Sequence, residues 1–474
     1  MKRLSLLILS FLIITVSCFA QQAKYVFFFI GDGMGVNQVH GTEMYLGELQ
    51  NKIGISPLLF TQFPYMTVAT TFSASSGVTD SAASGTALAT GYKTKNGTLG
   101  LKPDLKTPVS SVAVWAKQAG KRVGVCTTVG VDNATPAAFY AHQVSRDSYY
   151  QIGLDLIKAK FDYYGGSDFV QPTGKENPQA ENLYSLSEKA GFTIARGYKE
   201  YLQKSKTAKN MILLQPKEAK DIEEFPYAID RQEGDMTLEE QTKAGLDFLM
   251  KDNKKGFFFM VEGGKIDHAC HGNDGAAMVQ EVVDFDNAIR IAYNFYKKHP
   301  KETLIVISAD HETGGIVLGN GKYSINLKAL ASQKVSQVKF TEIVENMRKE
   351  NNNHVTWEMM QQALKKYFGF WDTIKLNTDQ EYAIKKAYEA SFSTSNAKMD
   401  ENMYSKNELV AAAARKIIND IANISWASYS HSGGYVPVYA IGAGADLFHS
   451  RTDNSELPKK IAKAAGYVIK TITK

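Results

Sequence analysis

The sequence has few cysteines, little charge bias and a single long hydrophobic run. Of its three cysteines, only Cys126 and Cys270 lie beyond the N-terminal segment; they leave one disulfide open but cannot form a disulfide framework. No second long apolar run follows the first twenty residues, which argues against a polytopic membrane protein. The 54 Lys and Arg residues against 49 Asp and Glu give a formal net charge of +5, a weak basis for nucleic-acid binding.

Repeats and low-complexity tracts are absent from the sequence as well. The composition, with 44% hydrophobic and 22% charged residues, is typical of a globular protein and argues against a mostly disordered, collagen-like or coiled-coil chain. A chain of 474 residues can bury a large core. The length is compatible with about three domains or with one large α/β domain that carries an insertion.

The N-terminus has the pattern of a signal peptide. Lys2 and Arg3 precede an apolar run over residues 4–16, and small Ala20 follows, so we expect residues 1–20 to be removed after Ala20. An uncleaved anchor would need about 20 apolar residues to span a membrane. Lipidation at Cys18 is a third interpretation, which ranks lower because the preceding residues match a lipobox poorly. The predicted mature protein, residues 21–474, is exported and is periplasmic or secreted.

Short apolar runs alternate with amphipathic helical stretches along the chain. This alternation is typical of a mainly parallel sheet covered on both faces. We predict strands over 25–30, 123–127, 257–261, 304–308 and 438–441. We predict helices over 237–250, which begins with a capping box between Thr237 and Glu240, and over 278–298. The expected fold class is α/β, a three-layer α/β/α sandwich with a large, mostly parallel central sheet.

Residues 327–423 differ from the rest of the chain. They are rich in Lys, Glu, Asn and Gln, have helical periodicity over 356–367 and 409–421, and show little strand signal. We predict an inserted helical subdomain within a catalytic domain of residues 21–474. A continuation of the main domain with long surface helices remains an alternative.

Carboxylates and imidazoles gather after the predicted strands. Open α/β sheets bind ligands beyond the carboxyl ends of their strands, so these side chains should meet at one edge. The residues in question are Asp32, Glu262, Asp267, His268, His271, Asp310 and His311, with His431 preceding the last strand. Singly, such residues are most often turn, surface or core residues. Together they would be costly to assemble without cations, and imidazole with carboxylate suits zinc while carboxylate with hydroxyl suits magnesium. The pattern predicts a polynuclear metal site.

A second constellation surrounds Ser81. Small residues from Ala82 onward, closed by Gly91, predict a tightly packed helix with Ser81 at its N-terminus. Free backbone N–H groups at that end favour an anion, and a hydroxyl there can approach a phosphorus atom. The alternative is that Asp80 or Ser81 simply caps the helix.

A third constellation runs from residue 133 to residue 146. Thr135 offers a neutral oxygen to a hard cation, and the planar guanidinium of Arg146 suits two phosphate oxygens. A single arginine is more often a solvated surface charge. His142 is interpreted as a structural residue, because its spacing does not tie it to the other candidates.

These motifs, in this order, resemble those of the alkaline phosphatase family. The matching segments are 30–35, 79–84, 133–137, 261–264 with 266–268, 309–311 and 431–434. The resemblance implies that Ser81 is the nucleophile and Arg146 the phosphate clamp. It implies two Zn²⁺ ions, one held by Asp267, His271 and His431 and the other by Asp32, Asp310 and His311 with Ser81 as its reactive ligand. It also implies one Mg²⁺ held by Asp32, Thr135 and Glu262.

Two neighbouring positions depart from the best-known bacterial pattern. Asn133 stands where Asp or His is usual, and a neutral amide attracts hydrated magnesium less than a carboxylate does. His268 stands where Lys or His occurs, as in the animal-type enzymes, and favours zinc over magnesium at the third site. Whether that site prefers Mg²⁺ or Zn²⁺ stays open.

The resemblance implies hydrolysis of small-molecule phosphate monoesters at alkaline pH through a phosphoserine intermediate. A phosphodiesterase or sulfatase on the same bimetal core is the nearest alternative, and a cofactor-independent mutase is a more distant one. A non-catalytic phosphate- or metal-binding surface protein is the alternative from another class, but such a protein should lack Ser81 or a zinc ligand. No nucleic-acid partner and no membrane span after cleavage are expected, and a homodimer is left open.

Overall fold

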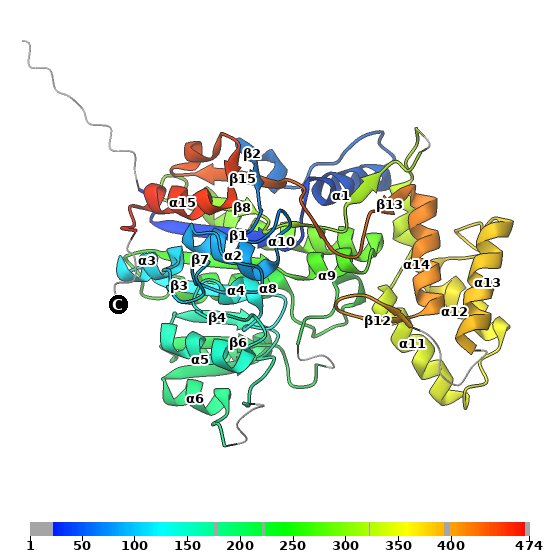
Figure 1. Ribbon diagram of the computed structural model, residues 1–474, viewed down its shortest axis with the longest axis horizontal. Helices are drawn as coiled ribbons and strands as arrows, with labels where there is room; N and C mark the ends of the chain where they lie inside the picture. The colour runs from blue at the N-terminus through cyan, green and yellow to red at the C-terminus, as the bar shows by residue number, and fades with distance from the viewer. Residues whose placement is uncertain (1–21, 175–178, 220–222, 322, 393–398, 470–474) are drawn as a thin grey trace, which may run out of the picture.

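The computed structural model describes residues 22–174, 179–219, 223–321, 323–392 and 399–469 (Figure 1). The predicted signal peptide, including Cys18 and Ala20, lies outside these residues. The large sheet is mixed and mostly parallel. Its ten strands stand in the spatial order β16 (Thr452–Asp453), β2 (Tyr65–Thr70), β15 (Val436–Gly442), β8 (Thr303–Ser308), β1 (Tyr25–Gly31), β7 (Phe257–Gly263), β3 (Arg122–Thr127), β4 (Tyr163–Gly166), β6 (Asn210–Leu214) and β5 (Phe192–Arg196).

The five predicted strands are confirmed as β1, β3, β7, β8 and β15, each within two residues of the expected bounds. The remaining five strands of the sheet were not predicted. Strand β15 runs antiparallel to β2 and β8, which makes the sheet mixed on one side of β1. The expected α/β class with a mostly parallel central sheet is therefore correct.

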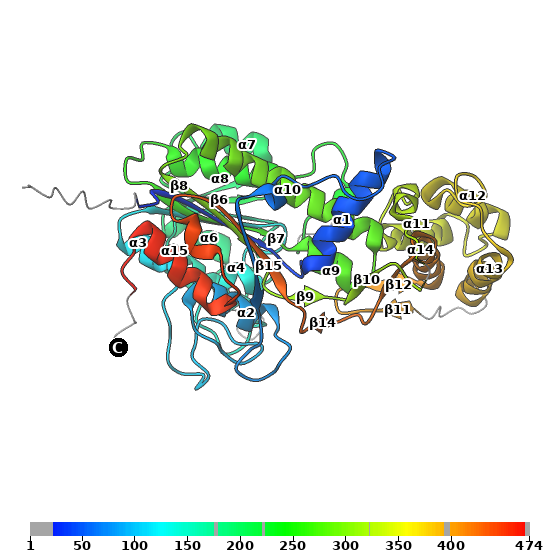
Figure 2. The ribbon, with the colours of Figure 1, turned by 90° about the horizontal axis from the view of Figure 1, so that it is seen from above.

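Helices cover the sheet on both faces (Figure 2). One layer contains α7 (Gly197–Lys204), α8 (Leu238–Met250) and α10 (Gly275–Lys298), with α1 (Val36–Leu49) packed beside α10. The other layer contains α2 (Ser81–Thr90), α3 (Val112–Gln118), α4 (Ala134–Ala137), α5 (Tyr149–Ala159), α6 (Leu183–Lys189) and α15 (Leu457–Ala465). The capping box of α8 forms as predicted, whereas α10 begins three residues earlier than expected because Asp274 caps it by accepting from Ala277 N–H.

The register of β1 with its two neighbours places three strand ends at one edge of the sheet. Strand β1 is buried along its whole length and lies between β7 and β8, parallel to both. Its register pairs Ile30 with Glu262 on one side and with Ser308 on the other. All three strands therefore end at the same level, and the residues that follow them share one edge of the sheet.

The stretch 327–423 lies beyond that edge, at one end of the molecule in both views (Figures 1 and 2). It contains α11 (Gln337–Glu350), α12 (Trp357–Phe368), α13 (Thr378–Phe392) and α14 (Leu409–Ala422). It also contains an antiparallel hairpin of β11 (Met399–Glu401) and β12 (Lys406–Glu408), in a region where the sequence had indicated little strand structure. The short helix α9 (Lys265–His271) lies between these helices and the sheet.

Two expectations about cysteines and membranes can be checked. Cys126 and Cys270 are both free and buried, so the disulfide that the sequence left open is not formed. Within the described residues, every helix is too short or too polar to cross a bilayer.

Candidate active site

The candidate residues converge beyond the carboxyl ends of β1, β7 and β8. Asp32 follows β1, Glu262 is the last residue but one of β7, and Asp310 lies two residues after β8. Gly33 makes this convergence possible: its φ is +69°, and a Cβ there would lie 2.8 Å from the Cα of Asp267. Glycine is the residue that tolerates both the positive φ and the close approach. Its backbone N–H also donates to Asp310 Oδ1 at 3.2 Å.

The first imidazole–carboxylate group contains Asp267, His271 and His431. His271 Nε2 lies 3.3 Å from Asp267 Oδ2 and 3.0 Å from His431 Nε2. His431 Nε2 lies 3.7 Å from Asp267 Oδ1. Asp267 and His271 are one turn apart on α9, so they share a helix face. His431 arrives from the short strand β14 (His431–Ser432), which pairs with β9 (Glu312–Thr313).

The imidazoles of this group are oriented by backbone carbonyls. His271 Nδ1 donates to the carbonyl of Tyr429 at 2.5 Å, and His431 Nδ1 donates to the carbonyl of Thr79 at 2.8 Å. A proton held on Nδ1 leaves the Nε2 lone pair free to bind a metal. Both lone pairs then face Asp267.

The second group contains Asp32, Asp310 and His311, and it includes the hydroxyl of Ser81. His311 Nε2 lies 3.4 Å from Asp32 Oδ1 and 3.2 Å from Asp310 Oδ2. Ser81 Oγ lies 3.2 Å from the same nitrogen. Ser81 is the first residue of α2, and the helix is capped by Asp80, as the alternative interpretation of the sequence had it. The free N–H groups of the first turn are thus at the site together with the hydroxyl.

The two groups adjoin through His311. Its imidazole stacks on that of His431, with ring centroids 3.5 Å apart. Ligand atoms of Asp267, His311 and His431 also lie within 4.8 Å of one another, as do those of Asp32, Asp310 and His311. His311 can therefore contribute a metal ligand to either group, and the sequence did not indicate this sharing.

The third cluster lies on the other side of Asp32. Thr135 Oγ1 donates to Asp32 Oδ2 at 3.4 Å, and Thr127 Oγ1 donates to Glu262 Oε2 at 2.5 Å. Asn133 caps α4 by accepting from Ala134 N–H at 2.6 Å. The amide oxygen of Asn133 is thus already engaged with the backbone.

The electrostatics of the site fit bound dications. Asp32, Glu262, Asp267 and Asp310 are all buried. Burial, followed by the charge of Asp310, raises the pKa of Asp32 well above its usual range. Burial and the charge of Asp267 raise the pKa of Asp310 to about 8, and burial raises that of Glu262 to about 7. Burial alone would raise the pKa of Asp267 too, but His271 and His431 hold it well below its usual range.

Hydrogen bonding in the site also fits bound dications. Within the part of the chain that the structure describes, Asp32 Oδ1, Asp267 Oδ2 and Asp310 Oδ2 are buried and accept no hydrogen bond. Buried carboxylate oxygens without donors are costly, and cations are the partners that offset this cost. The donor set of carboxylate, imidazole and hydroxyl suits zinc and magnesium.

Arg146 lies beside α2, the helix that begins at Ser81. Its Nη1 donates to Asp80 Oδ2 at 3.4 Å and its Nη2 to Asn133 Oδ1 at 3.5 Å. These long hydrogen bonds hold the guanidinium next to the first turn of α2. His142, interpreted as structural, has its Nε2 3.0 Å from the carbonyl oxygen of Val109.

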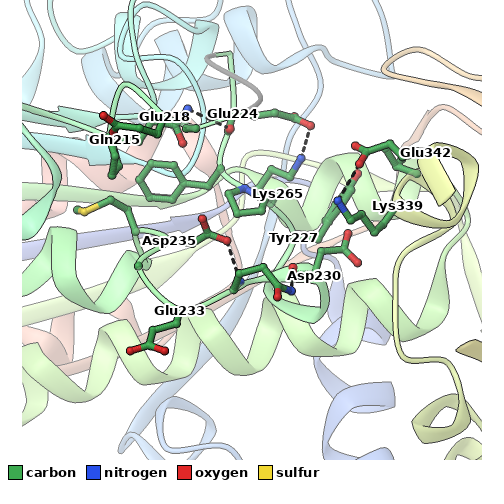
Figure 3. Close-up of a pocket in the computed structure, with 18 residues that line it drawn as sticks. Gln215, Glu218, Glu224, Tyr227, Asp230, Glu233, Asp235, Lys265, Lys339 and Glu342 are labelled. Carbon is green, nitrogen blue, oxygen red and sulfur yellow. Dashed lines mark hydrogen bonds and ion pairs between the residues drawn. The ribbon is translucent and has the colours of Figure 1, made fainter. Parts of the chain in front are cut away.

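His268 is held by a residue that the sequence analysis missed. Its Nδ1 is hydrogen-bonded to Glu224 Oε2, and Glu224 Oε1 forms an ion pair with Lys265 Nζ at 2.5 Å. Glu224, Lys265 and Tyr227 line a cavity of about 400 Å³. Figure 3 shows these three side chains close together. The Lys265 ammonium also lies 3.8 Å from the centroid of the Tyr227 ring. Burial would raise the pKa of Glu224, but Lys265 and His268 hold it far below its usual range.

The comparisons with known proteins agree with this geometry. The family model described as alkaline phosphatase matches residues 23–467. The chain belongs to the alkaline phosphatase family. Alkaline phosphatase 4 of Bacillus subtilis (strain 168) is 32% identical to it over 389 residues, which cover 81% of this chain and 76% of that protein. Alkaline phosphatase 3 of the same strain is 31% identical over 455 residues, which cover 95% and 90%.

Solved alkaline phosphatase structures share the fold. The cold-active alkaline phosphatase from the psychrophile Shewanella sp. superposes with a TM-score of 0.76 at 28% identity, covering 93% of this chain and 99% of that one. The Thermus thermophilus alkaline phosphatase has a TM-score of 0.75 at 23% identity, covering 96% and 94%. The three-layer architecture is therefore that of the alkaline phosphatases.

Other residues near the alkaline phosphatase site also escaped the sequence analysis. Thr313 Oγ1 donates to Asp267 Oδ1 at 2.5 Å and lies 3.1 Å from His311 Nδ1. In the sequence, the position of Thr313 three residues after Asp310 could have indicated its place in the site. Lys265 was also visible, as a charged residue directly after a strand-end glycine pair. Tyr404 lies against His268 and His271, and no sequence pattern connected it with them.

Proposed function

We propose that this protein hydrolyses phosphate monoesters at alkaline pH, with Ser81 as the nucleophile. The observation that carries the proposal is the position of Ser81 Oγ. It lies at the N-terminus of α2 and 3.2 Å from His311 Nε2, beside the donor-free carboxylate oxygens of Asp32 and Asp310. A hydroxyl so placed can attack a phosphorus atom whose oxygens face the helix N-terminus.

The residues that would hold the metals are those implied by the resemblance. Two Zn²⁺ ions and one Mg²⁺ fit the three clusters, which are Asp267 with His271 and His431, Asp32 with Asp310 and His311, and Asp32 with Thr135 and Glu262. When bound, zinc lowers the pKa of a coordinated hydroxyl and stabilises the charge of a leaving oxygen. The engaged amide oxygen of Asn133 and the ion-paired His268 leave the preference of the third cluster between magnesium and zinc to measurement.

The chain's own residues would act in two half-reactions. Ser81 Oγ gives its proton to solvent and forms a bond to phosphorus, while the bond from phosphorus to the ester oxygen breaks with inversion. The departing ester oxygen takes up a proton from solvent and leaves as the alcohol. Water then attacks the phosphoseryl group from the side that the alcohol left, and Ser81 Oγ becomes the leaving oxygen. Arg146 and the first N–H groups of α2 bind the non-bridging oxygens in both steps.

Arg146 favours a monoester over a diester. A planar guanidinium forms two parallel hydrogen bonds with two unsubstituted oxygens, and the doubly charged monoester offers these more readily. The rival reading is a phosphodiesterase or sulfatase on the same bimetal core. A non-catalytic binding protein would be expected to lack Ser81 or one of the proposed zinc ligands, and all of these residues are present in the sequence.

The direct test compares the hydrolysis of 4-nitrophenyl phosphate with that of bis-4-nitrophenyl phosphate and 4-nitrophenyl sulfate at pH 7 to 10. We expect the monoester to have the highest kcat/KM, with activity rising toward alkaline pH. A preference for the diester or the sulfate would replace the proposed reaction by that of the rival. Metal analysis of the purified protein, with chelation and add-back of zinc and magnesium, tests the proposed ion content.

Export of the protein is proposed on the N-terminal pattern. Cleavage after Ala20 gives a periplasmic or secreted catalytic domain of residues 21–474, with residues 327–423 as a helical insertion. N-terminal sequencing of the protein recovered from its natural compartment tests the cleavage site and the alternative of lipidation at Cys18. Light scattering tests whether the protein is a homodimer.

A further inference from the structure

Tyr404 comes from the helical insertion but lies at the candidate active site. It occupies the turn between β11 and β12, where Asn402 Oδ1 accepts from the backbone N–H groups of Tyr404 and Ser405, each at 2.9 Å. Ser405 Oγ in turn accepts from the Asn407 side chain at 2.8 Å. These side chain–backbone hydrogen bonds fix the turn that presents the tyrosine ring.

The hairpin itself is anchored in the insertion. Glu408, at the end of β12, accepts from Arg348 Nε at 2.9 Å and from Arg348 Nη2 at 2.6 Å. The backbone N–H of Glu408 donates to Thr341 Oγ1 at 3.0 Å. Arg348 and Thr341 both belong to α11. The position of Tyr404 is therefore set by the insertion and not by the central sheet.

The ring of Tyr404 packs against two site histidines. It stacks on His268, with ring centroids 3.8 Å apart and planes at 21°. It meets His271 nearly edge-on, with centroids 5.0 Å apart and planes at 71°. The residue is still 37% exposed, so part of the ring remains available to a ligand.

Tyr404 lies beside the histidine group at which the ester oxygen leaves in the proposed reaction. In an in-line displacement, the attacking and leaving oxygens are on opposite sides of phosphorus. Ser81 lies beside His311, and the group of Asp267, His271 and His431 adjoins through the stacked rings of His311 and His431. In the proposed reaction Ser81 attacks from the first group, and the ester oxygen leaves at the second. Tyr404 is in contact with His271 on that side. An organic group that leaves at this second group would therefore lie near Tyr404.

We propose that Tyr404 contacts the organic group of the phosphate monoester and favours esters of aromatic alcohols over those of small aliphatic alcohols. The inference rests on the proposed hydrolysis at Ser81 and assigns the helical insertion a role in substrate selection. Tyr404 is then a specificity residue: it touches the alcohol part of the substrate but neither transfers a proton nor binds a metal.

The test measures kcat/KM of the wild type and of Tyr404→Ala and Tyr404→Phe with phenyl phosphate and with ethyl phosphate. Dividing each variant by the wild type for the same substrate removes the difference in intrinsic reactivity between the esters. We expect Tyr404→Ala to lower kcat/KM for phenyl phosphate about three- to tenfold, the range for one aromatic contact, and to change ethyl phosphate less than about twofold. Tyr404→Phe keeps the ring and should retain the aromatic preference.

Matched measurements separate this role from a structural one. Met403→Ala alters the same turn at a side chain that is 62% exposed and should leave both substrates unchanged. Competitive inhibition by inorganic phosphate should be the same in Tyr404→Ala as in the wild type, because phosphate lacks an organic group. An equal loss for both esters, or a loss in Tyr404→Phe as large as in Tyr404→Ala, would overturn the proposal. A wild type inactive on both esters would instead overturn the proposed function, and this inference with it.

Discussion

Asp80 connects α2, the helix that begins at Ser81, with Arg146. One of its carboxylate oxygens accepts from the backbone N–H of Ala83 at 3.0 Å and so caps α2, and the other accepts from Arg146 Nη1 at 3.4 Å. The carboxylate that begins the helix of Ser81 thus also orients the guanidinium. The proposed nucleophile, Ser81, and the proposed phosphate clamp, Arg146, are positioned relative to each other through this one side chain.

This connection leads to a prediction for Arg146. In Arg146→Ala, the phosphate oxygens lose two charge-assisted hydrogen bonds while the metal ligands stay in place. We expect KM for 4-nitrophenyl phosphate and the inhibition constant of phosphate each to rise about 10- to 100-fold, with a smaller fall in kcat. In Arg146→Lys, both constants should lie between those of the wild type and those of Arg146→Ala, because lysine keeps the positive charge but cannot form the planar fork. Steady-state kinetics check this, and wild-type constants in Arg146→Ala would remove the clamp assignment.

Ser81→Ala removes the attacking oxygen and little else. Ser81 is buried at the first position of α2, which Asp80 still caps, so folding should be preserved. We expect phosphoenzyme trapped at low pH to vanish and kcat to fall by at least about three orders of magnitude. Zinc content should stay near that of the wild type. Full turnover in this variant would exclude Ser81 as the nucleophile.

Metal removal should destabilise the fold as well as abolish activity. Without cations, Asp32 and Asp310 are buried carboxyls in close proximity, and their raised pKa values reflect this cost. We expect chelation to lower the melting temperature at pH 8, and zinc add-back to restore it. Asp310→Asn removes one of the opposed charges, so its melting temperature should fall less on chelation. A chelated wild type as stable as the untreated protein would contradict the idea that these carboxylates need a cation.

Glu224 should matter for stability because it is the counter-ion of buried Lys265. Glu224→Gln can still accept from His268 but leaves the ammonium without its charge partner. We expect a loss of about 2 kcal/mol in the free energy of unfolding. The double variant Glu224→Gln/Lys265→Met should recover part of that loss, since no buried charge then stands alone.

Glu218→Gln serves as the control for this pair, because Glu218 lines the same cavity from an exposed position (Figure 3). Urea unfolding of the four proteins completes the comparison. A double variant no more stable than Glu224→Gln would mean that the unpaired ammonium is not the cause of the loss.

Asp230 gives the fold a dependence on pH away from the metal ligands. Burial raises the pKa of its carboxyl to about 6, even though Ser336 donates to it twice. The folded state then binds a proton more tightly than the unfolded chain, so this contribution to stability is full below the unfolded-state pKa of about 3.9 and is lost as the pH rises through 6.

Asp230→Asn should lack this loss. From pH 4 to pH 7, the free energy of unfolding of the variant should improve relative to the wild type by about 2 kcal/mol. Comparing the two proteins cancels the effects of metal loss that they share. Glu233→Gln, an exposed change on the same cavity wall, should run parallel to the wild type. Parallel pH profiles for Asp230→Asn and the wild type would contradict the raised pKa.

The sheet was predictable where its strands are long, apolar and buried on both faces. Strands β1 and β7 read as continuous hydrophobic runs, and the chemistry-bearing residues follow them directly. Strand β4, with the sequence Tyr-Tyr-Gly-Gly, is too short and glycine-rich to give such a signal. Strand β5, at the edge, is only partly buried, so its pattern is weak.

The candidate site was predictable to the extent that its residues sit at strand ends. Asp32, Glu262 and Asp310 follow strands whose mutual register fixes their distance. Glu224 and Tyr404 reach the site from a loop and from a hairpin turn, whose positions depend on tertiary contacts such as the bridge between Glu224 and Val129. No local periodicity records contacts of that kind, so these two residues required the structure.

The residues of the candidate site are spread along the chain from Asp32 to His431, and β15 enters the sheet between β2 and β8 only after His431 has been made. A nascent chain that has not yet been extended to His431 contains Ser81 but lacks both the His431 imidazole and strand β15. Such a chain lacks part of the candidate site, so the complete site can form only after His431 has left the ribosome.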